Sequence, residues 1–332
     1  MLRFIARRAL AALALAFVLA TGGLVLARAA GGDYVSQSLG LGARPETIER
    51  LRAARGLDRP FAEQYAGWLR GAVRLDFGTS LLYQRPVRDL VAGRTANSAL
   101  LAFGALLVAC LAGLPLGLLS GSRPRTFAAQ AVRALSALCI SVPPLIASLL
   151  LVWAAGVTGL FPIGGMTSLA LDDGRMASRL LDVLWHLPVP VLALAIPLAA
   201  TLERIQSQAI AGALADPAIT AARARGVSAR RALWAHAFRL SAKAPIAVGG
   251  VLAGAVLSGS FAVELVTSWP GLGRLTYEAL VARDVPLVAG CATAGALLVS
   301  LGLVVSDVLL AVADPRILER AAPEDAAAGA AP

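Results

Sequence analysis

Residues 95–122 read TANSALLAFGALLVACLAGLPLGLLSGS and carry no charged side chain over 28 positions. A helix needs about 20 consecutive apolar residues to cross the hydrocarbon core of a bilayer. Because lipid offers the backbone no water, only a helix can satisfy its own N–H and C=O groups over such a length. The stretch therefore predicts a membrane-spanning helix at about residues 97–120.

The composition of the whole chain agrees with this prediction. Of its 332 residues, 58% are hydrophobic and 15% are charged, and the mean hydropathy is +0.74. Soluble domains have about 45–50% apolar and about 25% charged residues. So much apolar surface excludes a disordered chain. It also argues against a soluble enzyme, because a folded sphere of this size has too little interior to bury it.

Reading from charge to charge gives five further uncharged runs. The first could also be a cleaved signal peptide, but its 19 residues exceed the roughly 7–15 of such a segment. Another contains Pro143-Pro144, which makes its second half irregular. We expect an all-α integral membrane protein with six transmembrane helices. These are residues 9–27, 97–120, 134–156, 183–202, 244–263 and 285–310.

Basic residues predict the orientation, because Lys and Arg mark the cytoplasmic side of a membrane protein. Residues 1–8 carry three arginines and no acid, and the loop 203–243 carries seven basic residues against two acidic ones. We expect both termini in the cytoplasm, residues 28–94 as a small folded extracytoplasmic segment, and residues 320–332 as a disordered tail. This asymmetry accounts for most of the net charge of +10, so the charge is weak evidence for nucleic-acid binding.

The expected spans show little sign of reactive chemistry. None carries a charge near its middle, whereas a proton-driven carrier needs ionisable groups at that depth. This favours a transporter that is driven by an outside energy source. A channel lined by hydroxyls and carbonyls is the alternative. His186 and His236 lack partners at metal-ligand spacing. No Walker sequence occurs. We expect no catalytic, cofactor or metal site, and any ATP hydrolysis to take place on another chain.

Small residues recur at four-residue spacing in two expected spans. The clearest set is Gly113, Gly117 and Gly121. Such spacing lets helix backbones approach closely. The partner helix could belong to this chain or to another subunit.

The loop 203–243 contains the most informative motif. Pro217 suits the first turn of a helix, Gly226 suits its end, and Ser228 is placed to cap a second helix that runs to about Arg239. The two helices would project from the membrane as a small helix–turn–helix with arginines beside alanines. Such a shape fits a groove in a partner protein. An amphipathic helix lying on anionic lipid is the alternative.

This loop resembles the EAA loop of binding-protein-dependent ABC importer permeases, in which Glu-Ala-Ala is followed three residues later by Gly. Here TAA at residues 220–222 precedes Gly226, and ARARGVS (222–228) and HAFR (236–239) are similar to the version in dipeptide, oligopeptide and nickel permeases. The resemblance covers nearly the whole chain, and it points to the first permease subunit of that family. The other matching segments are RGLDRP (55–60), QY (64–65), DFGTS (76–80), RPV (85–87), SWPGLGR (268–274) and DPR (314–316).

The resemblance implies the type I ABC importer permease fold and a set of partners. These would be a second, similar permease subunit, one or two cytoplasmic ABC ATPase subunits and an extracytoplasmic substrate-binding protein. The loop would dock into a cleft of the ATPase through Thr220, Ala221, Ala222, Arg223, Ala224, Arg225 and Gly226. The binding protein would touch residues 28–94 and the segment Trp269, Pro270 and Gly271.

Two positions depart from the family pattern. Ala218 stands where the family usually has an aromatic residue, directly after the proline. Thr220, two places later, stands where a basic residue is common. The docking surface could therefore differ or be weaker. Peptides are the expected cargo, with nickel or another small solute as the alternative in the same class. A self-contained channel or secondary carrier and a membrane scaffold without transport are the other classes.

Overall fold

A computed structural model describes residues 2–29, 34–35, 45–54, 58–74, 76–168 and 176–313. Helices dominate this part of the chain, and its only β feature is an isolated antiparallel bridge between Thr79 and Pro86. The expected all-α class is confirmed. The expected tail at 320–332 and the motifs at 55–57 and 314–316 lie outside the described residues.

Within these described ranges, five helices are long and apolar enough to cross a membrane. They are α1 (Leu2–Ala29), α5 (Val87–Ser122), α9 (Pro188–Leu214), α14 (Gly249–Val266) and α16 (Val285–Ala313). Two shorter helices, α6 (Phe127–Ser141) and α7 (Pro144–Thr158), form a bent pair that would make a sixth span.

The span expected at residues 134–156 is therefore not one continuous helix. Between α6 and α7 the axis bends by 101°. Pro143 has φ −60° and ψ +149°, an extended conformation, and Pro144 begins α7. The cause is the Pro143-Pro144 pair, because a proline disfavours the helical conformation of the residue before it and itself donates no hydrogen bond.

Other helices extend past the charges used to delimit them. Helix α5 begins at Val87, so residues 87–94, expected in the external segment, are its first turns. Helix α9 continues to Leu214 and takes up the first part of the expected cytoplasmic loop. The fifth span divides at Val248 into α13 (Lys243–Ala247) and α14.

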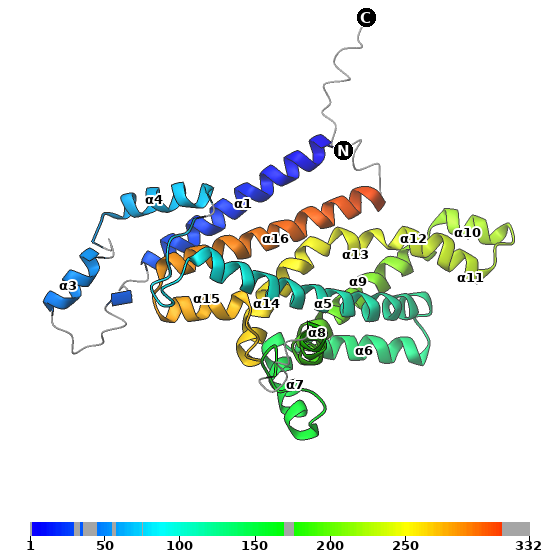
Figure 1. Cartoon of the computed structure of the whole chain (residues 1–332). Helices are drawn as coiled ribbons and strands as arrows, with labels where there is room; N and C mark the ends of the chain where they lie inside the picture. Colours follow the sequence, from blue (N-terminus) through cyan, green and yellow to red (C-terminus); the bar gives the residue numbers. More distant parts are fainter. Residues whose placement is uncertain are drawn as a thin grey trace, which may run out of the picture.

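Helices α5 and α9 form the centre of the packing. A Cβ atom on Gly113, Gly117 or Gly121 would lie within 2.6 Å of an atom of α9. The four-residue spacing thus serves packing within the chain, where only glycine permits this approach. Helix α1 lies along α16 (Figure 1), where Ser300 Oγ donates to the Ala12 carbonyl at 3.0 Å.

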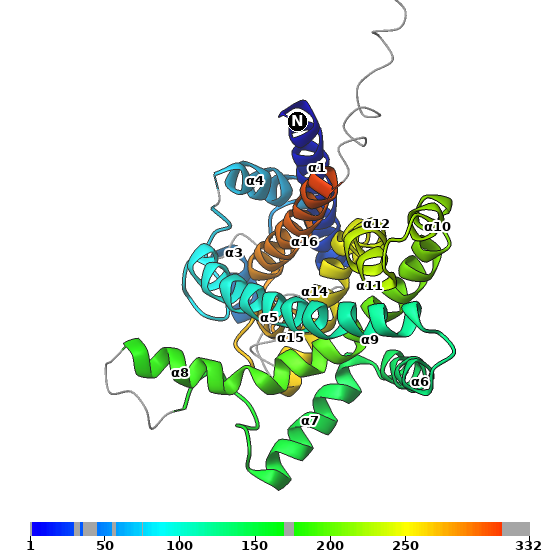
Figure 2. The ribbon, with the colours of Figure 1, turned by 90° about the vertical axis from the view of Figure 1, so that its right-hand side faces the viewer.

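The molecule has two ends, with different elements at each (Figure 1). One end holds the start of α1, the end of α16, the α5–α6 turn and the short helices α10 (Pro217–Ala224) and α11 (Ala229–Arg231). At the other end lie α3 (Pro45–Ala54), α4 (Phe61–Val73) and α15 (Leu272–Val281). Helices α7 and α8 (Met176–His186) point away from the long-helix layer (Figure 2).

Candidate functional site

Helix α10 begins at Pro217 and ends in a turn at Gly226, as the sequence predicts, and it is capped at both ends. The Asp216 carboxylate accepts a hydrogen bond from the Ala218 N–H at 2.8 Å, and Pro217 occupies the first turn. At the other end Gly226 has φ +90°, and the N–H of Val227 bonds the Ala222 carbonyl at 3.2 Å. A side chain at positive φ is strained, so glycine suits this turn.

The loop 217–241 forms a pair of helical arms, of which α10 is the first. The second arm differs from the regular helix expected between Ser228 and Arg239. Ser228 does cap it, accepting from the Arg231 N–H at 3.4 Å. After α11, however, the chain forms a π-helix, η1 (Ala232–Ala237), before α12 (Phe238–Ser241). A π-turn of this kind inserts one residue into a helix and turns its face.

The two arms pack on each other and on the long helices. Ile219 of α10 is buried together with Ala232 and Ala237 of η1, against Ile210 of α9. Ala222 was expected among the residues that dock on the partner, and the structure corrects this. The residue is only 9% exposed and belongs to the internal packing of the loop.

The outer face of α10 is left open to a partner. Thr220, Ala221 and Ala224 are exposed, and so is Gly226 at the turn. Trp234 is 54% exposed, and its ring lies 5.8 Å from the Phe238 ring, centroid to centroid, at an interplanar angle of 52°. Arginine side chains surround this face, all of them exposed: Arg223, Arg225, Arg230, Arg231 and Arg239.

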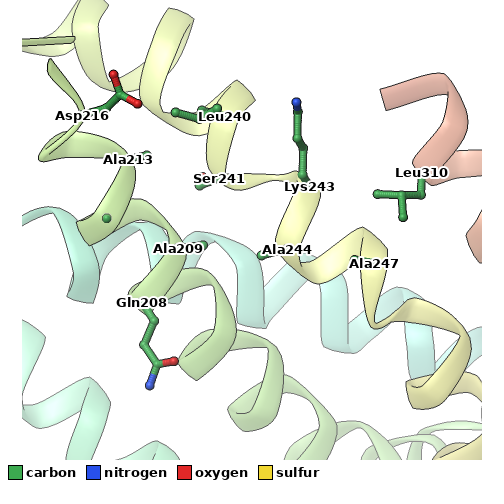
Figure 3. A pocket seen from close by; sticks show the side chains of 11 residues that line it. Gln208, Ala209, Ala213, Asp216, Leu240, Ser241, Lys243, Ala244, Ala247 and Leu310 are labelled. Atoms are coloured by element: carbon green, nitrogen blue, oxygen red, sulfur yellow. The ribbon is translucent and has the colours of Figure 1, made fainter. Parts of the chain in front are cut away.

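A cavity of about 570 Å³ lies behind the pair, between α9, α12, α13 and the last part of α16 (Figure 3). Asp216, which caps α10, lines it together with Leu240, Lys243 and Leu310. Small side chains form much of the remaining wall, among them Ala209, Ala213, Ala244 and Ala247. The cavity thus joins the base of α10 to two membrane helices.

At the opposite end the expected binding-protein contact needs correction. The Trp269 side chain is fully buried, so it is not available to a partner in this structure. Its Nε1 donates to the Asn97 carbonyl at 3.2 Å, and Asn97 Nδ2 donates to the Pro270 carbonyl at 2.8 Å. Gly271 is also buried and Pro270 is half-buried. Exposed large apolar side chains on the following helix α15 include Tyr277, Leu280 and Val281.

A buried carboxylate holds this loop in place, although the charge pattern of the sequence placed it outside the spans. Glu264 belongs to α14 and is 0% exposed. One oxygen accepts from Ser98 Oγ at 2.6 Å, and the other accepts from the backbone N–H groups of Gly273 at 2.7 Å and Arg274 at 3.1 Å. The Leu272 N–H bonds Ser98 Oγ at 2.7 Å. Glu264 and Ser98 thus cap the N-terminus of α15 from other helices.

Two further polar links hold the residues after α4 against α15. Asp284 is buried and accepts from Ser80 Oγ at 2.6 Å and from the Leu82 N–H at 2.9 Å. Tyr83 donates its hydroxyl to Glu278 at 2.5 Å. Burial raises the pKa of Tyr83 from 10.0 to about 12, and the hydrogen bond to the Glu278 carboxylate adds to this rise.

A third link joins the residues after α7 to α8. Asp182 accepts from the Ser168 N–H at 2.6 Å and from Ser168 Oγ at 2.9 Å. The backbone hydrogen bond from Ser168 lowers the pKa of Asp182. His186 Nδ1 lies 3.3 Å from the same carboxylate. Over the described ranges, no group of three or more His, Cys, Asp or Glu side chains could hold a metal ion.

The chain combines several apolar spans with a hydrogen-bonded loop at one end of the molecule and an exposed helix–turn–helix at the other end. These features are those of a membrane transport subunit. The chain belongs to the family described as "Binding-protein-dependent transport system inner membrane component", which it matches over residues 113–319. Residues 1–94 match that family's N-terminal membrane component. It is accordingly an integral membrane protein with several membrane-spanning helices.

Curated relatives match over most of their length. One is the oligopeptide transport system permease protein AppB of Bacillus subtilis (strain 168), 30% identical over 96% of this chain and 99% of its own. A putative peptide transport system permease protein of Brucella suis biovar 1 is 33% identical over 86% of this chain and 89% of its own. The inner membrane ABC transporter permease protein YejB of Escherichia coli O157:H7 is 32% identical over 84% of this chain and 78% of its own.

Proposed function

We propose that this chain is one of two similar permease subunits that form the pathway of an ATP-driven importer for dipeptides or oligopeptides. Relatives whose names state peptide or oligopeptide transport align with 86% and 96% of the chain. The observation that carries the proposal is the family match over both the N-terminal and the permease regions. The chain itself would hydrolyse nothing, and one or two ABC ATPase subunits would supply the energy.

The ATPase would dock on the outer face of α10 and the turn after it, through Thr220, Ala221, Arg223, Ala224, Arg225 and Gly226. The capped, rigid α10 exposes Thr220, Ala221 and Ala224 at its outer face, and arginines surround that face. Buried Ile219 would keep α10 fixed to η1 and α9. A movement of the ATPase cleft would therefore reach α9 directly, and α9 packs along α5 through the glycine contacts.

Sidedness follows from the same arrangement. The chain would lie in a bacterial inner membrane. The α10 end and both termini would face the cytoplasm, because the turns and loops at this end are rich in arginine. The binding protein would meet the opposite end. There the exposed Tyr277, Leu280 and Val281 of α15 replace Trp269 as the proposed contact.

The test of the proposed function is transport by the assembled importer in proteoliposomes. We expect labelled Ala-Ala to accumulate only when ATP, the binding protein and the ATPase subunits are present. This chain alone should move none. Uptake by the chain alone would replace the proposal with a carrier or channel, and accumulation of Ni²⁺ without peptide would replace the cargo.

The docking surface has its own test. Cysteine at Ala221 or Ala224 should form crosslinks to the ATPase subunit, because both side chains are exposed on α10. Cysteine at Gly212, exposed on α9 and outside the proposed surface, is the matched control and should form few. Crosslinks from 221 and 224 to phospholipid alone would favour a membrane-surface helix instead.

A further inference from the structure

A second cavity, of about 410 Å³, lies between α6 and α9. These helices lie side by side (Figure 2). Ligand sites in proteins have volumes of roughly 300–1,000 Å³, so the space suits a small molecule. Polar and charged residues contribute to its wall: Arg133 and Ser136 come from α6, and Glu203, Arg204, Ser207 and Gln208 come from α9.

Glu203 is the unusual member of this wall. It lies near the middle of the 27-residue α9 and is 1% exposed. Ser120 donates its hydroxyl to one carboxylate oxygen. No ion pair to Glu203 occurs in the part of the chain that the structure describes. A buried carboxylate without a cationic partner is costly. Ionisable groups inside membrane helices commonly mark substrate pathways.

Two arginines give the same cavity positive charge. Arg133 and Arg204 are both exposed and both line it. Arg133 Nη2 donates to the Ser120 carbonyl at 2.9 Å, so Ser120 connects the arginine to the Glu203 carboxylate. A bare divalent cation would meet two guanidinium groups here, and an anion would meet a carboxylate. A zwitterion, with a primary ammonium and an acidic group, matches both charges.

We infer that this cavity binds a small zwitterion, with the primary ammonium on Glu203 and the acidic group on Arg133 and Arg204. The inference rests on the proposed function and makes the zwitterion the free peptide on its way out of the pathway. The cavity includes Arg133, close to the α5–α6 turn, which lies at the same end as α10 (Figure 1). That is the end proposed to face the cytoplasm.

The test is peptide protection of a cysteine in the cavity wall. Ala137 lines the cavity and is exposed, so Ala137→Cys can be placed in a chain whose Cys110, Cys139 and Cys291 are replaced by alanine. The whole importer is reconstituted so that a water-soluble thiol reagent and peptide reach the α10 end directly, which bypasses the binding protein. We expect Ala-Ala to slow the modification several-fold, and N-acetyl-Ala-Ala to leave it unchanged.

Matched variants assign the two charges. Glu203→Gln keeps the shape and should raise the half-protecting Ala-Ala concentration by at least about tenfold, because charge-assisted hydrogen bonds are lost. Ser120→Ala removes the contact to Glu203 and keeps its charge, so protection should survive. Arg204→Gln should weaken protection by Ala-Ala and not by Ala-Ala amide. Co-purification of the partner chains verifies that each variant assembles.

Equal protection by acetylated and free peptide, or an unchanged Glu203→Gln variant, would overturn the inference. Phosphatidylethanolamine carries the same pair of charges. If phosphoethanolamine protects the cysteine and Ala-Ala does not, the site belongs to a lipid headgroup and the peptide inference fails. ATP-dependent Ala-Ala uptake measured in parallel separates the two proposals, since uptake that persists without protection removes only this site.

Discussion

At the scale of single residues, Gly226 and Gly212 offer a direct comparison. Gly226 has φ +90°, whereas Gly212 lies in regular α9, where an added Cβ atom would meet nothing within 4 Å. An L-residue at left-handed φ costs about 1–2 kcal/mol. Gly226→Ala should therefore destabilise the loop and lower substrate-stimulated ATP hydrolysis. Gly212→Ala should leave hydrolysis intact and gain up to about 1 kcal/mol of helix stability.

Thermal unfolding and ATP hydrolysis of the assembled importer measure both effects. A Gly226→Ala importer that hydrolyses ATP as the wild type does would contradict the coupling role of this turn. Equal losses in the two variants would show instead that general packing, and not the turn, carries the effect.

Single residues also show where sequence interpretation fails. Gly226 was predictable, because a helix that begins at Pro217 and precedes a helix cap at Ser228 needs a turn residue between them. Trp269 was not, because its burial depends on Asn97, which is 172 positions away along the chain. Glu203 and Glu264 were interpreted as charges that end spans. Both lie inside helices, where their carboxylates accept hydrogen bonds from distant serines.

At the scale of elements, the start of α15 depends on one side chain of α14. Glu264→Gln removes the charge that accepts from Ser98, Gly273 and Arg274. Hydrogen bonds to a charged group contribute about 1.5–3 kcal/mol, so we expect a loss of that order in the free energy of unfolding. The first turn of α15 should also fray, and trypsin should then cleave after Arg274 faster.

Asp89→Asn is the control for this prediction. Asp89 pairs with Arg88 at 3.6 Å on the exposed surface of α5, and such pairs contribute about 0–1 kcal/mol. Its removal should alter unfolding little. If the two variants unfold alike, the buried cap is not what holds the loop.

The link between Tyr83 and α15 predicts a dependence on alkaline pH. The pKa of Tyr83 is about 12 in the folded state, against 10.0 for a free tyrosine. Below pH 10 the link is fully present. Between pH 10 and about 12 the unfolded chain loses the proton first, so the stability from this link falls as pH rises.

Ultraviolet titration of tyrosinate measures this in the assembled importer. Tyr83→Phe should remove the step with the midpoint near pH 12 and leave the earlier steps in place. A wild-type titration complete by about pH 11 would contradict the buried hydrogen bond to Glu278.

Element boundaries were predicted less well than element existence, and the cause is physical. Uncharged runs located every long helix. The predicted spans were too short, because their boundaries were placed at charges that lie inside the helices. These charges are Arg94 in α5 and Glu203 in α9. A helix ends where its backbone is capped or a proline intervenes, and a charge alone does neither. The break at Pro143-Pro144 is such a proline interruption. The sequence analysis predicted an irregular segment there but not two separate helices.

At the scale of the whole molecule, the structure and the charge pattern agree on two ends. Arginine-rich α10 and α11 lie with the start of α1 and the end of α16, while α15 and α4 lie opposite (Figure 1). The two proposed contacts, with the ATPase and with the binding protein, would thus stand on opposite faces. Helices α5 and α9, packed through glycines, connect the two ends.

This arrangement predicts which positions a membrane-impermeant thiol reagent reaches. In a chain without native cysteines, Asp58→Cys and Glu63→Cys should be labelled in intact spheroplasts, because both are exposed near α4. Arg125→Cys and Ala224→Cys are equally exposed and should be labelled only after permeabilisation. The physical reason is the retention of arginine-rich loops in the cytoplasm. Labelling of Ala224→Cys in intact spheroplasts would place α10 outside, beyond reach of any ATPase, and would remove the proposed coupling together with the orientation.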